Sequence, residues 1–157
     1  MKKIIAFFLI LLGLIFVACG KESGIGEFID KEKISSEYNI EKEDENSIKF
    51  KDKDENSEVY RIFSIEKMLK VDYNNPNKLD KLEEFYLNHD WKTLYKDEET
   101  LMVSHEEADT QGYEYNIHTF DNSKAELALI VSVGATRKVS EAELVNMLKE
   151  AKSFIKK

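Results

Sequence analysis

The chain contains one cysteine, Cys19, one proline and only six glycines among its 157 residues. A single cysteine excludes a disulfide within the chain. The scarcity of proline and glycine, with no internal repeat, argues against a low-complexity or disordered chain. Apolar residues make up 42% of the sequence, which is ordinary for a globular protein that is long enough to bury a core.

Positive charge is also in short supply. Lysine and arginine number 23 against 31 aspartate and glutamate residues, so the formal net charge is −8. An acidic surface repels phosphate backbones, and we therefore expect no nucleic-acid partner. The chain offers no polybasic segment for anionic lipid, so attachment to a membrane has to come from another source.

The first twenty residues differ from the rest of the chain. Lys2 and Lys3 form a short positive start, residues 4–17 are apolar apart from Gly13, and small residues flank Cys19. A basic start, an apolar middle and small residues at a cleavage point are the layout of a secretory signal peptide.

The stretch around the cysteine, FVACG, resembles the lipobox of bacterial lipoproteins. Val17, Ala18 and Cys19 fit the family pattern, whereas Phe16 stands where leucine is commonest. The resemblance implies that residues 1–18 are a cleaved signal peptide. It also implies diacylglycerol on the sulfur of Cys19 and usually a further acyl chain, such as palmitate, on its amine. A thioether there accounts for an unpaired cysteine in an oxidising compartment.

An uncleaved membrane anchor is the alternative. A spanning helix needs about 20 apolar residues, and the apolar run here is several residues shorter and ends at Cys19. We therefore expect a lipid-anchored protein of the bacterial cell envelope, held by two or more acyl chains. In enteric-type lipoproteins an aspartate after the cysteine retains the protein in the inner membrane. Gly20 in that position favours the outer membrane of a cell that has two.

Removing 18 of the 157 residues leaves 139, which is enough for one domain. Residues 19–35 are polar and contain Gly24 and Gly26, so we interpret them as a lipidated flexible tether. Residues 36–157 are then expected to form a single globular domain.

Alternation of apolar and polar residues, rich in β-branched and aromatic types, predicts seven strands. The last of them, LALIVSV, is apolar on both faces except for Ser132. This pattern predicts a central strand covered on both faces, either by helices or by a helix and neighbouring side chains. Residues 64–70 fit either a strand or the start of a helix. The predicted strands span residues 38–41, 48–51, 59–65, 91–95, 101–106, 113–120 and 127–133.

Two helices are predicted from their end signals and spacing. Asn75 and Pro76 give a capping side chain followed by proline at the first helical position, and this helix should end near His89. Ser140 and Glu143 form an S-x-x-E capping box before a C-terminal helix. The apolar stripe of that helix consists of Leu144, Leu148, Ala151 and Ile155.

The element order is therefore β-β-β-α-β-β-β-β-α. It predicts an α+β domain with an antiparallel sheet of about six or seven strands packed by two helices. From Tyr38 to the C-terminus, this order resembles the PsbP/Mog1-like fold, which also ends with a long apolar strand and a helix finishing in a Ser-Phe-like pair, here Ser153-Phe154. The resemblance rests on topology and implies a binding or assembly role rather than chemistry.

The histidines do not predict a metal site. His105 and His118 lie on neighbouring predicted strands. If residue 105 pairs with residue 115, residue 118 faces the other side of the sheet. If the pairing shifts by one, the two histidines share a face but lie about 13 Å apart. Neither register brings both within about 2.1 Å of one zinc ion, so we interpret them as solvent-facing.

Other chemistry is equally weak in the sequence. The acidic clusters at residues 41–45, 52–55 and 97–99 fall in predicted turns, and we interpret them as solvated loops. Calcium is the alternative, but none of them follows the D-x-[DN]-x-[DN]-G spacing. No G-x-S-x-G nucleophile motif occurs. Paired carboxylates stay open as an acid–base pair, because acidic residues are abundant throughout the chain.

One candidate surface is aromatic. Tyr113 and Tyr115 share a face of one predicted strand and would form a contact surface if that face is uncovered. We therefore expect an envelope lipoprotein without catalytic activity, cofactor or metal. It would bind the membrane through the acyl chains on Cys19 and a protein of the envelope through its domain. The alternative is a small-molecule or metal-ion binder, or a hydrolase, with a site that residue spacing does not reveal.

Overall fold

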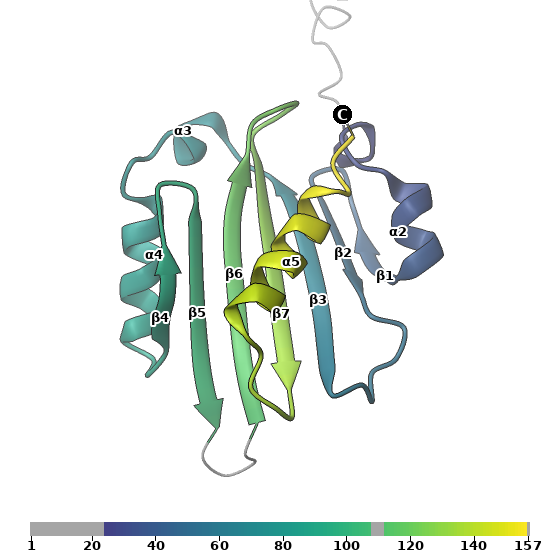
Figure 1. The fold of residues 1–157 in the computed structure, drawn as a ribbon. Helices are drawn as coiled ribbons and strands as arrows, with labels where there is room; N and C mark the ends of the chain where they lie inside the picture. The colour runs from purple at the N-terminus through teal and green to yellow at the C-terminus, as the bar shows by residue number, and fades with distance from the viewer. Residues whose placement is uncertain (1–23, 108–111, 157) are drawn as a thin grey trace, which may run out of the picture.

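A seven-stranded antiparallel sheet runs through the protein (Figure 1). The structure is a computed structural model that describes residues 24–107 and 112–156. The strands follow the order β1-β2-β3-β7-β6-β5-β4 across the sheet. They are β1 (Asn39–Glu43), β2 (Ser47–Lys51), β3 (Val59–Lys67), β4 (Lys92–Lys96), β5 (Thr100–Glu107), β6 (Gly112–Asp121) and β7 (Leu127–Ala135).

The helices confirm the predicted α+β class. Helix α5 packs on β6 and β7, and α4 packs on β4 and β5. In Figure 1, α5 crosses in front of the sheet and α4 lies along the β4–β5 margin. The helical segments are η1 (Ile25–Glu27), α2 (Lys31–Glu37), α3 (Lys70–Tyr73), α4 (Lys78–Leu87) and α5 (Glu141–Lys152).

Helices α4 and α5 cover opposite faces of the sheet. This follows from strand β5, whose neighbouring residues point to opposite sides. Met102 of β5 lies in the large core beneath α5, whereas Leu101 and Val103 lie in a smaller core with α4. The apolar positions read from the alternation therefore divide into two cores on the two faces.

Strand β7 is the fourth of seven strands, as its apolar sequence predicts. Leu127, Leu129 and Val131 are buried on the face covered by α5. On the other face, Ile130 and Ser132 are only half-buried. Helix cover is therefore complete on one face of the central strand and partial on the other.

The predicted flexible tether is wrong for residues 24–35, the part of it that the structure describes. Ile25, Ile29 and Ile34 are almost completely buried, and η1 and α2 carry them into the large core. Eight of the twelve residues 24–35 are glycine, serine or charged, but three isoleucines at intervals of four and five residues form an inward face. Residues 19–23 lie outside the described residues, as do residues 1–18.

The segment is held by the other end of the chain. Ile29 forms an antiparallel bridge with Ile155, flanked by backbone hydrogen bonds from Asp30 N–H to Phe154 O (2.7 Å) and from Lys156 N–H to Phe28 O (2.9 Å). Asp30 also caps α2 by accepting a hydrogen bond from Lys33 N–H at 3.1 Å. The two ends of the described chain are therefore joined at one edge of the sheet.

The C-terminal helix begins as predicted. The Ser140 hydroxyl accepts a hydrogen bond from Glu143 N–H, and the Glu143 carboxylate accepts one from Ser140 N–H at 2.9 Å. Leu144 and Ala151 from the predicted stripe are buried, with Met147 beside them. The capping box was confirmed because it depends only on residues close in sequence.

The first predicted helix begins later than expected. Helix α4 starts at Lys78 with Asn77 before it, not at Asn75 and Pro76. The Asn75 side chain instead accepts a hydrogen bond from Asn77 N–H at 3.0 Å and forms a turn ahead of the helix. The uncertain stretch 64–70 is mostly strand, because β3 continues to Lys67 before α3 begins.

Four aromatic rings join the N-terminal segment, the sheet and the C-terminus. Tyr38 makes edge contacts with Phe50, Phe63 and Phe154 at centroid distances of 5.1–5.5 Å. The Tyr38 hydroxyl donates to Glu150 of α5, and the same carboxylate accepts from Arg61 of β3 at 2.5 Å. Burial and this hydrogen bond raise the pKa of Tyr38 well above its ordinary value, so it stays a donor.

Replacing Ile29 by alanine should lower the free energy of unfolding by about 2–5 kcal/mol, because the side chain is 0% exposed in the core. Urea unfolding measures the loss. Leu87→Ala, at a side chain that is 52% exposed, should change the value by less than about 1 kcal/mol. Equal midpoints for the two variants would show that the segment is a tether after all.

Candidate functional site

Cys19 lies outside the described residues, but its distance along the chain from the domain is fixed. Ile25 is the first buried residue of the described chain, and it follows Cys19 by six positions. Ile25 N–H donates to Glu45 O in the β1–β2 turn at 2.8 Å. The chain therefore enters the domain at the end of the strands where the β1–β2 turn lies. We call this end of the sheet the N-terminal edge, in the sense of a row of strand ends and not of an edge strand.

The two predicted contact tyrosines share one face of β6, and that face is the one covered by α5. Tyr115 is only 5% exposed, and its hydroxyl accepts a hydrogen bond from Val139 N–H at 3.0 Å. Tyr115 therefore belongs to the core, and the prediction that it forms part of a contact surface is wrong. Tyr113 is half-buried beneath the Lys138 ammonium, 5.7 Å from its ring centroid.

Tyr113 lines a cavity of about 390 Å³ between β4, β5 and the start of α5. Charged side chains of both signs stand around the cavity, including Lys92, Glu106 and Lys138. Leu94 adds an exposed apolar wall. The surface around Tyr113 is thus a small mixed pocket rather than a flat aromatic face.

The strand register decides how the two strand histidines are placed. His105 pairs with Glu114, and His118 pairs with Leu101, so the histidines share the face covered by α4. This is the second of the two predicted registers. The prediction that both face solvent is wrong for His118, which is 9% exposed because α4 covers it. His105 is half-buried and stacks on Trp91 at a centroid distance of 5.5 Å.

Helix α4 builds an aromatic row along this face. The Tyr86 hydroxyl lies 2.8 Å from Nε2 of His118, and the Tyr86 ring packs against Trp91 at 5.0 Å. Burial lowers the pKa of His118 from 6.5 to about 4, so the ring is neutral at pH 7. Trp91 follows Asp90, whose positive φ of 64° reverses the chain after α4 and turns the indole back toward Tyr86.

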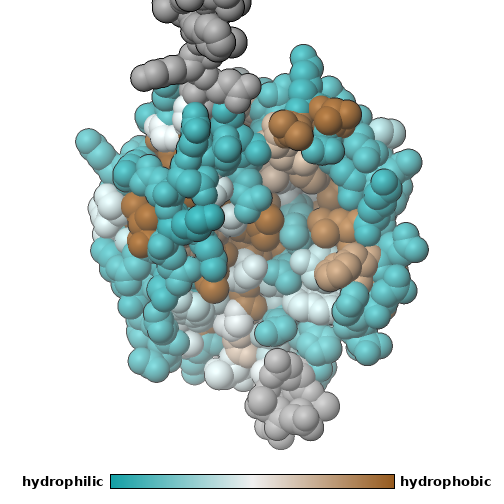
Figure 2. Space-filling model, turned by 180° about the vertical axis from the view of Figure 1, so that it is seen from behind, coloured by the Kyte–Doolittle hydropathy of each residue, from teal (hydrophilic) through white to brown (hydrophobic). Residues whose placement is uncertain are grey.

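Beside this row, the face opposite α5 is open over the middle strands. Figure 2 shows neutral and apolar side chains gathered in a hollow between hydrophilic margins. A groove of about 300 Å³ lies there. A β-carbon added at Gly134 would meet nothing within 4 Å, so the groove is unfilled at this strand. Its lining includes Tyr60, Ile62, Trp91, Asn116, Ser132 and Gly134.

Sequence reasoning missed this open-face groove. Alternation shows which strand positions share a face, but it does not show that α4 stops short of β7 and β3. Glycine inside a strand was the available signal, since it marks a place without a packed side chain.

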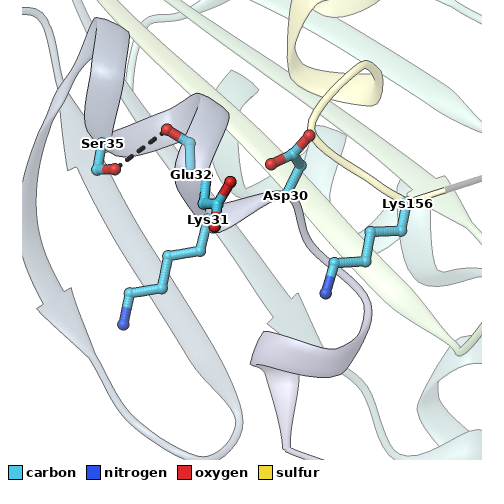
Figure 3. Close-up of a pocket in the computed structure, with 5 residues that line it drawn as sticks. All are labelled: Asp30, Lys31, Glu32, Ser35 and Lys156. Carbon is cyan, nitrogen blue, oxygen red and sulfur yellow. Dashed lines mark hydrogen bonds between the residues drawn. The ribbon is translucent and has the colours of Figure 1, made fainter.

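A wider depression of about 620 Å³ lies beside α2 (Figure 3). Its side chains make local contacts: Ser35 donates to Glu32 O at 3.1 Å, and Lys156 donates to Gly26 O at 3.1 Å. Lys31 pairs with Glu43 at 2.5 Å. Figure 3 shows the Lys31 and Lys156 side chains extending the same way while the Asp30 carboxylate points elsewhere, so the groups do not converge on one point.

Aspartates of the acidic clusters stabilise turns by accepting backbone hydrogen bonds. Asp44 accepts hydrogen bonds from Asn46 N–H and Ser47 N–H at 3.0 and 2.8 Å, and Asp97 accepts from Glu99 N–H and Thr100 N–H at 2.9 and 2.7 Å. Across residues 24–107 and 112–156, His, Cys, Asp and Glu form no group of three that could hold a metal ion. Over the same ranges, no helix is both long and apolar enough to cross a membrane.

Comparisons with protein families, curated proteins and solved structures find no match to this chain. The resemblances to the lipobox and to the PsbP/Mog1-like fold therefore stay predictions from the sequence.

The burial of His118 predicts a pH-dependent stability. The unfolded state takes up a proton near pH 6.5, whereas the folded state resists it down to about pH 4. The stabilisation that comes from the neutral His118 ring is thus complete above pH 6.5 and is lost progressively as the pH falls from 6.5 to about 4. Between pH 7 and pH 4.5, this group should lower the free energy of unfolding by about 2 kcal/mol.

His118→Gln should remove that part of the pH dependence in urea unfolding while keeping an acceptor for the Tyr86 hydroxyl. Tyr86→Phe is the control, because it deletes the hydrogen bond and leaves the histidine buried. An unchanged pH profile in His118→Gln would rule out this histidine as the source.

Proposed function

We propose that the protein is a lipoprotein of the bacterial cell envelope whose domain binds another envelope protein without catalysing a reaction. The observation that supports this most is the short chain between Cys19 and the domain. The buried Ile25 lies six positions after Cys19, and six residue steps of extended chain span at most about 20 Å. Acyl chains on Cys19 would therefore hold the N-terminal edge against the bilayer.

The lipid accounts for the membrane attachment that the charge of the chain does not provide. A net charge of −8 gives little attraction to anionic lipid. Two or more acyl chains suffice for stable anchoring, since each buried methylene contributes about 0.8 kcal/mol. Gly20 after the cysteine favours the outer membrane in a cell with two membranes.

The open-face groove supports the binding role. Tyrosine and tryptophan are enriched at protein interfaces because they combine apolar area with a polar group. Tyr60 and Trp91 offer such area in the groove, and Asn116 and Ser132 supply hydrogen-bonding groups. The groove lies on the face that α5 leaves uncovered, where a protein segment can approach without displacing a helix.

Several titratable groups that could serve chemistry have structural partners. His118 is buried against Tyr86, and His105 stacks on Trp91. The Arg61 guanidinium donates to the Asp52 carboxylate at 2.7, 3.0 and 3.2 Å, next to its contact with Glu150. This use of the available acids and bases favours binding over catalysis.

The anchor is tested by Cys19→Ala expressed in the native host. The variant should move from the membrane to the soluble fraction after detergent-free fractionation, because no acyl chain can be attached to alanine. A variant that stays in the membrane with its leader uncleaved would support a spanning anchor instead.

The binding surface is tested by Gly134→Trp. The new side chain should fill the groove and change the free energy of unfolding by less than about 0.5 kcal/mol, since its β-carbon meets no atom within 4 Å and the position is exposed. Affinity capture of the lipidated protein from its own envelope, with mass spectrometry of the partners, should then lose a partner that the wild type retains.

Asn146→Trp is the matched control for this capture, because residue 146 is exposed on α5, away from the groove. It should retain the partner. Retention by both variants would exclude the groove as the binding surface.

The cavity near Tyr113 favours a second candidate, the binding of a small molecule. Its volume of about 390 Å³ falls within the usual range for ligand pockets, and Lys92 and Lys138 stand at its wall. Tyr113→Ala should abolish retention of such a ligand in native mass spectrometry of the purified protein, whereas Gly134→Trp should leave it unchanged.

A further inference from the structure

Helix α3 carries an exposed apolar tip. Leu69 and Val71 are 70% and 74% exposed, more than any other large hydrophobic side chain of the described chain. Figure 2 shows apolar side chains standing out where α3 meets solvent, apart from those of the open-face groove. We call Leu69 and Val71, with Lys70 between them, the α3 tip.

The residues on either side of the α3 tip are held to the rest of the protein. Met68 N–H donates to Glu126 O at 2.8 Å, which fixes the chain just before the tip. Tyr73 packs edge-on against Phe120 of β6 at a centroid distance of 6.1 Å, which fixes the chain just after it. The residues on either side thus face the protein, while Leu69 and Val71 remain in solvent.

The α3 tip lies at the N-terminal edge. Lys67 N–H, at the end of β3, donates to Asn46 O of the β1–β2 turn at 2.8 Å, and Ile25 N–H binds the same turn through Glu45. Figure 1 shows α3 and η1 at the same end of the sheet. From β2 to β6 there are three strand spacings, or about 15 Å. The α3 tip and the point of chain entry therefore lie at the same end of the strands, as two separate corners of the N-terminal edge.

We propose that the α3 tip inserts into the headgroup–acyl boundary of the bilayer that holds the lipid anchor. This inference rests on the proposed anchor at Cys19. The anchor would bring one corner of the edge to within about 20 Å of the membrane, and an apolar side chain at the other corner gains by leaving water. Two contacts then hold the domain with its strands steep to the membrane plane.

The acidic turns beside the α3 tip determine which lipid headgroups the tip can approach. Carboxylates of the turns at residues 97–99 and 121–123 lie at the same end of the strands as the tip. Anionic headgroups would be repelled by these turns, so the attraction comes from the apolar side chains and not from Lys70. The insertion therefore occurs in a zwitterionic bilayer and depends little on salt.

The test uses the acylated full-length product in phosphatidylcholine vesicles. Val71→Cys places a nitroxide at the tip, since the sulfur of Cys19 is blocked by lipid. Collisions of the label with a water-soluble nickel chelate should be roughly threefold fewer than for a label at Asn56→Cys, because interfacial segments lie about 5–10 Å into the boundary. Asn56 is exposed in the β2–β3 turn, at the opposite end of the sheet.

A second measurement does not require a label in the tip itself. A nitroxide at Asn122→Cys, in the β6–β7 turn, should gain chelate collisions when Leu69 and Val71 are both replaced by serine. Phe85→Ser with Leu87→Ser is the matched pair, because these side chains are 55% and 52% exposed on α4. That pair should leave the label at position 122 unchanged.

The outcomes separate the tip from the anchor. A protein that floats with the vesicles while the label at position 71 is as chelate-accessible as that at position 56 overturns the insertion and leaves the anchor standing. A label shielded from both chelate and oxygen indicates a protein contact and also overturns it. A chain that lacks acylation and does not float overturns the anchor, and the insertion with it.

Discussion

The antiparallel bridge between Ile29 and Ile155 joins the two ends of the described chain, and much of the structure depends on it. It seats the N-terminal segment under the end of α5, where the backbone hydrogen bonds of Asp30 and Lys156 flank it. The aromatic cluster of Tyr38, Phe50, Phe63 and Phe154 then closes over the same region. Because the segment is folded, little chain remains between Cys19 and the domain.

Local patterns in the sequence predicted most of the fold. The seven strands, the capping box of Ser140 and Glu143, and the α+β class depend on alternation and on contacts within one helical turn. The burial of Ile29 could not be predicted in this way, because its partner is 126 residues along the chain. The start of α4 was misplaced for a local reason, since Asn75 forms a turn of its own instead of capping the helix.

The candidate sites were harder to predict than the fold. Tyr113 and Tyr115 share a face as predicted, but the start of α5 covers Tyr115, and cover by a helix is a tertiary property. His118 was placed in solvent because neither strand register lets it share a metal ion with His105, yet α4 buries it against Tyr86. The open-face groove arises from the short reach of α4 across the sheet, which no run of residues encodes.

In the arrangement that we propose, a lipid at Cys19 holds the folded N-terminal edge at the membrane and leaves the open-face groove free for a partner. The strands would stand steeply on the membrane, with α5 on one side and the open-face groove on the other. The most direct measurement is the intact mass of the protein extracted from its own envelope. We predict the mass of residues 19–157 plus diacylglycerol, with or without an amide-linked acyl chain. The unmodified mass of residues 1–157 would contradict the account.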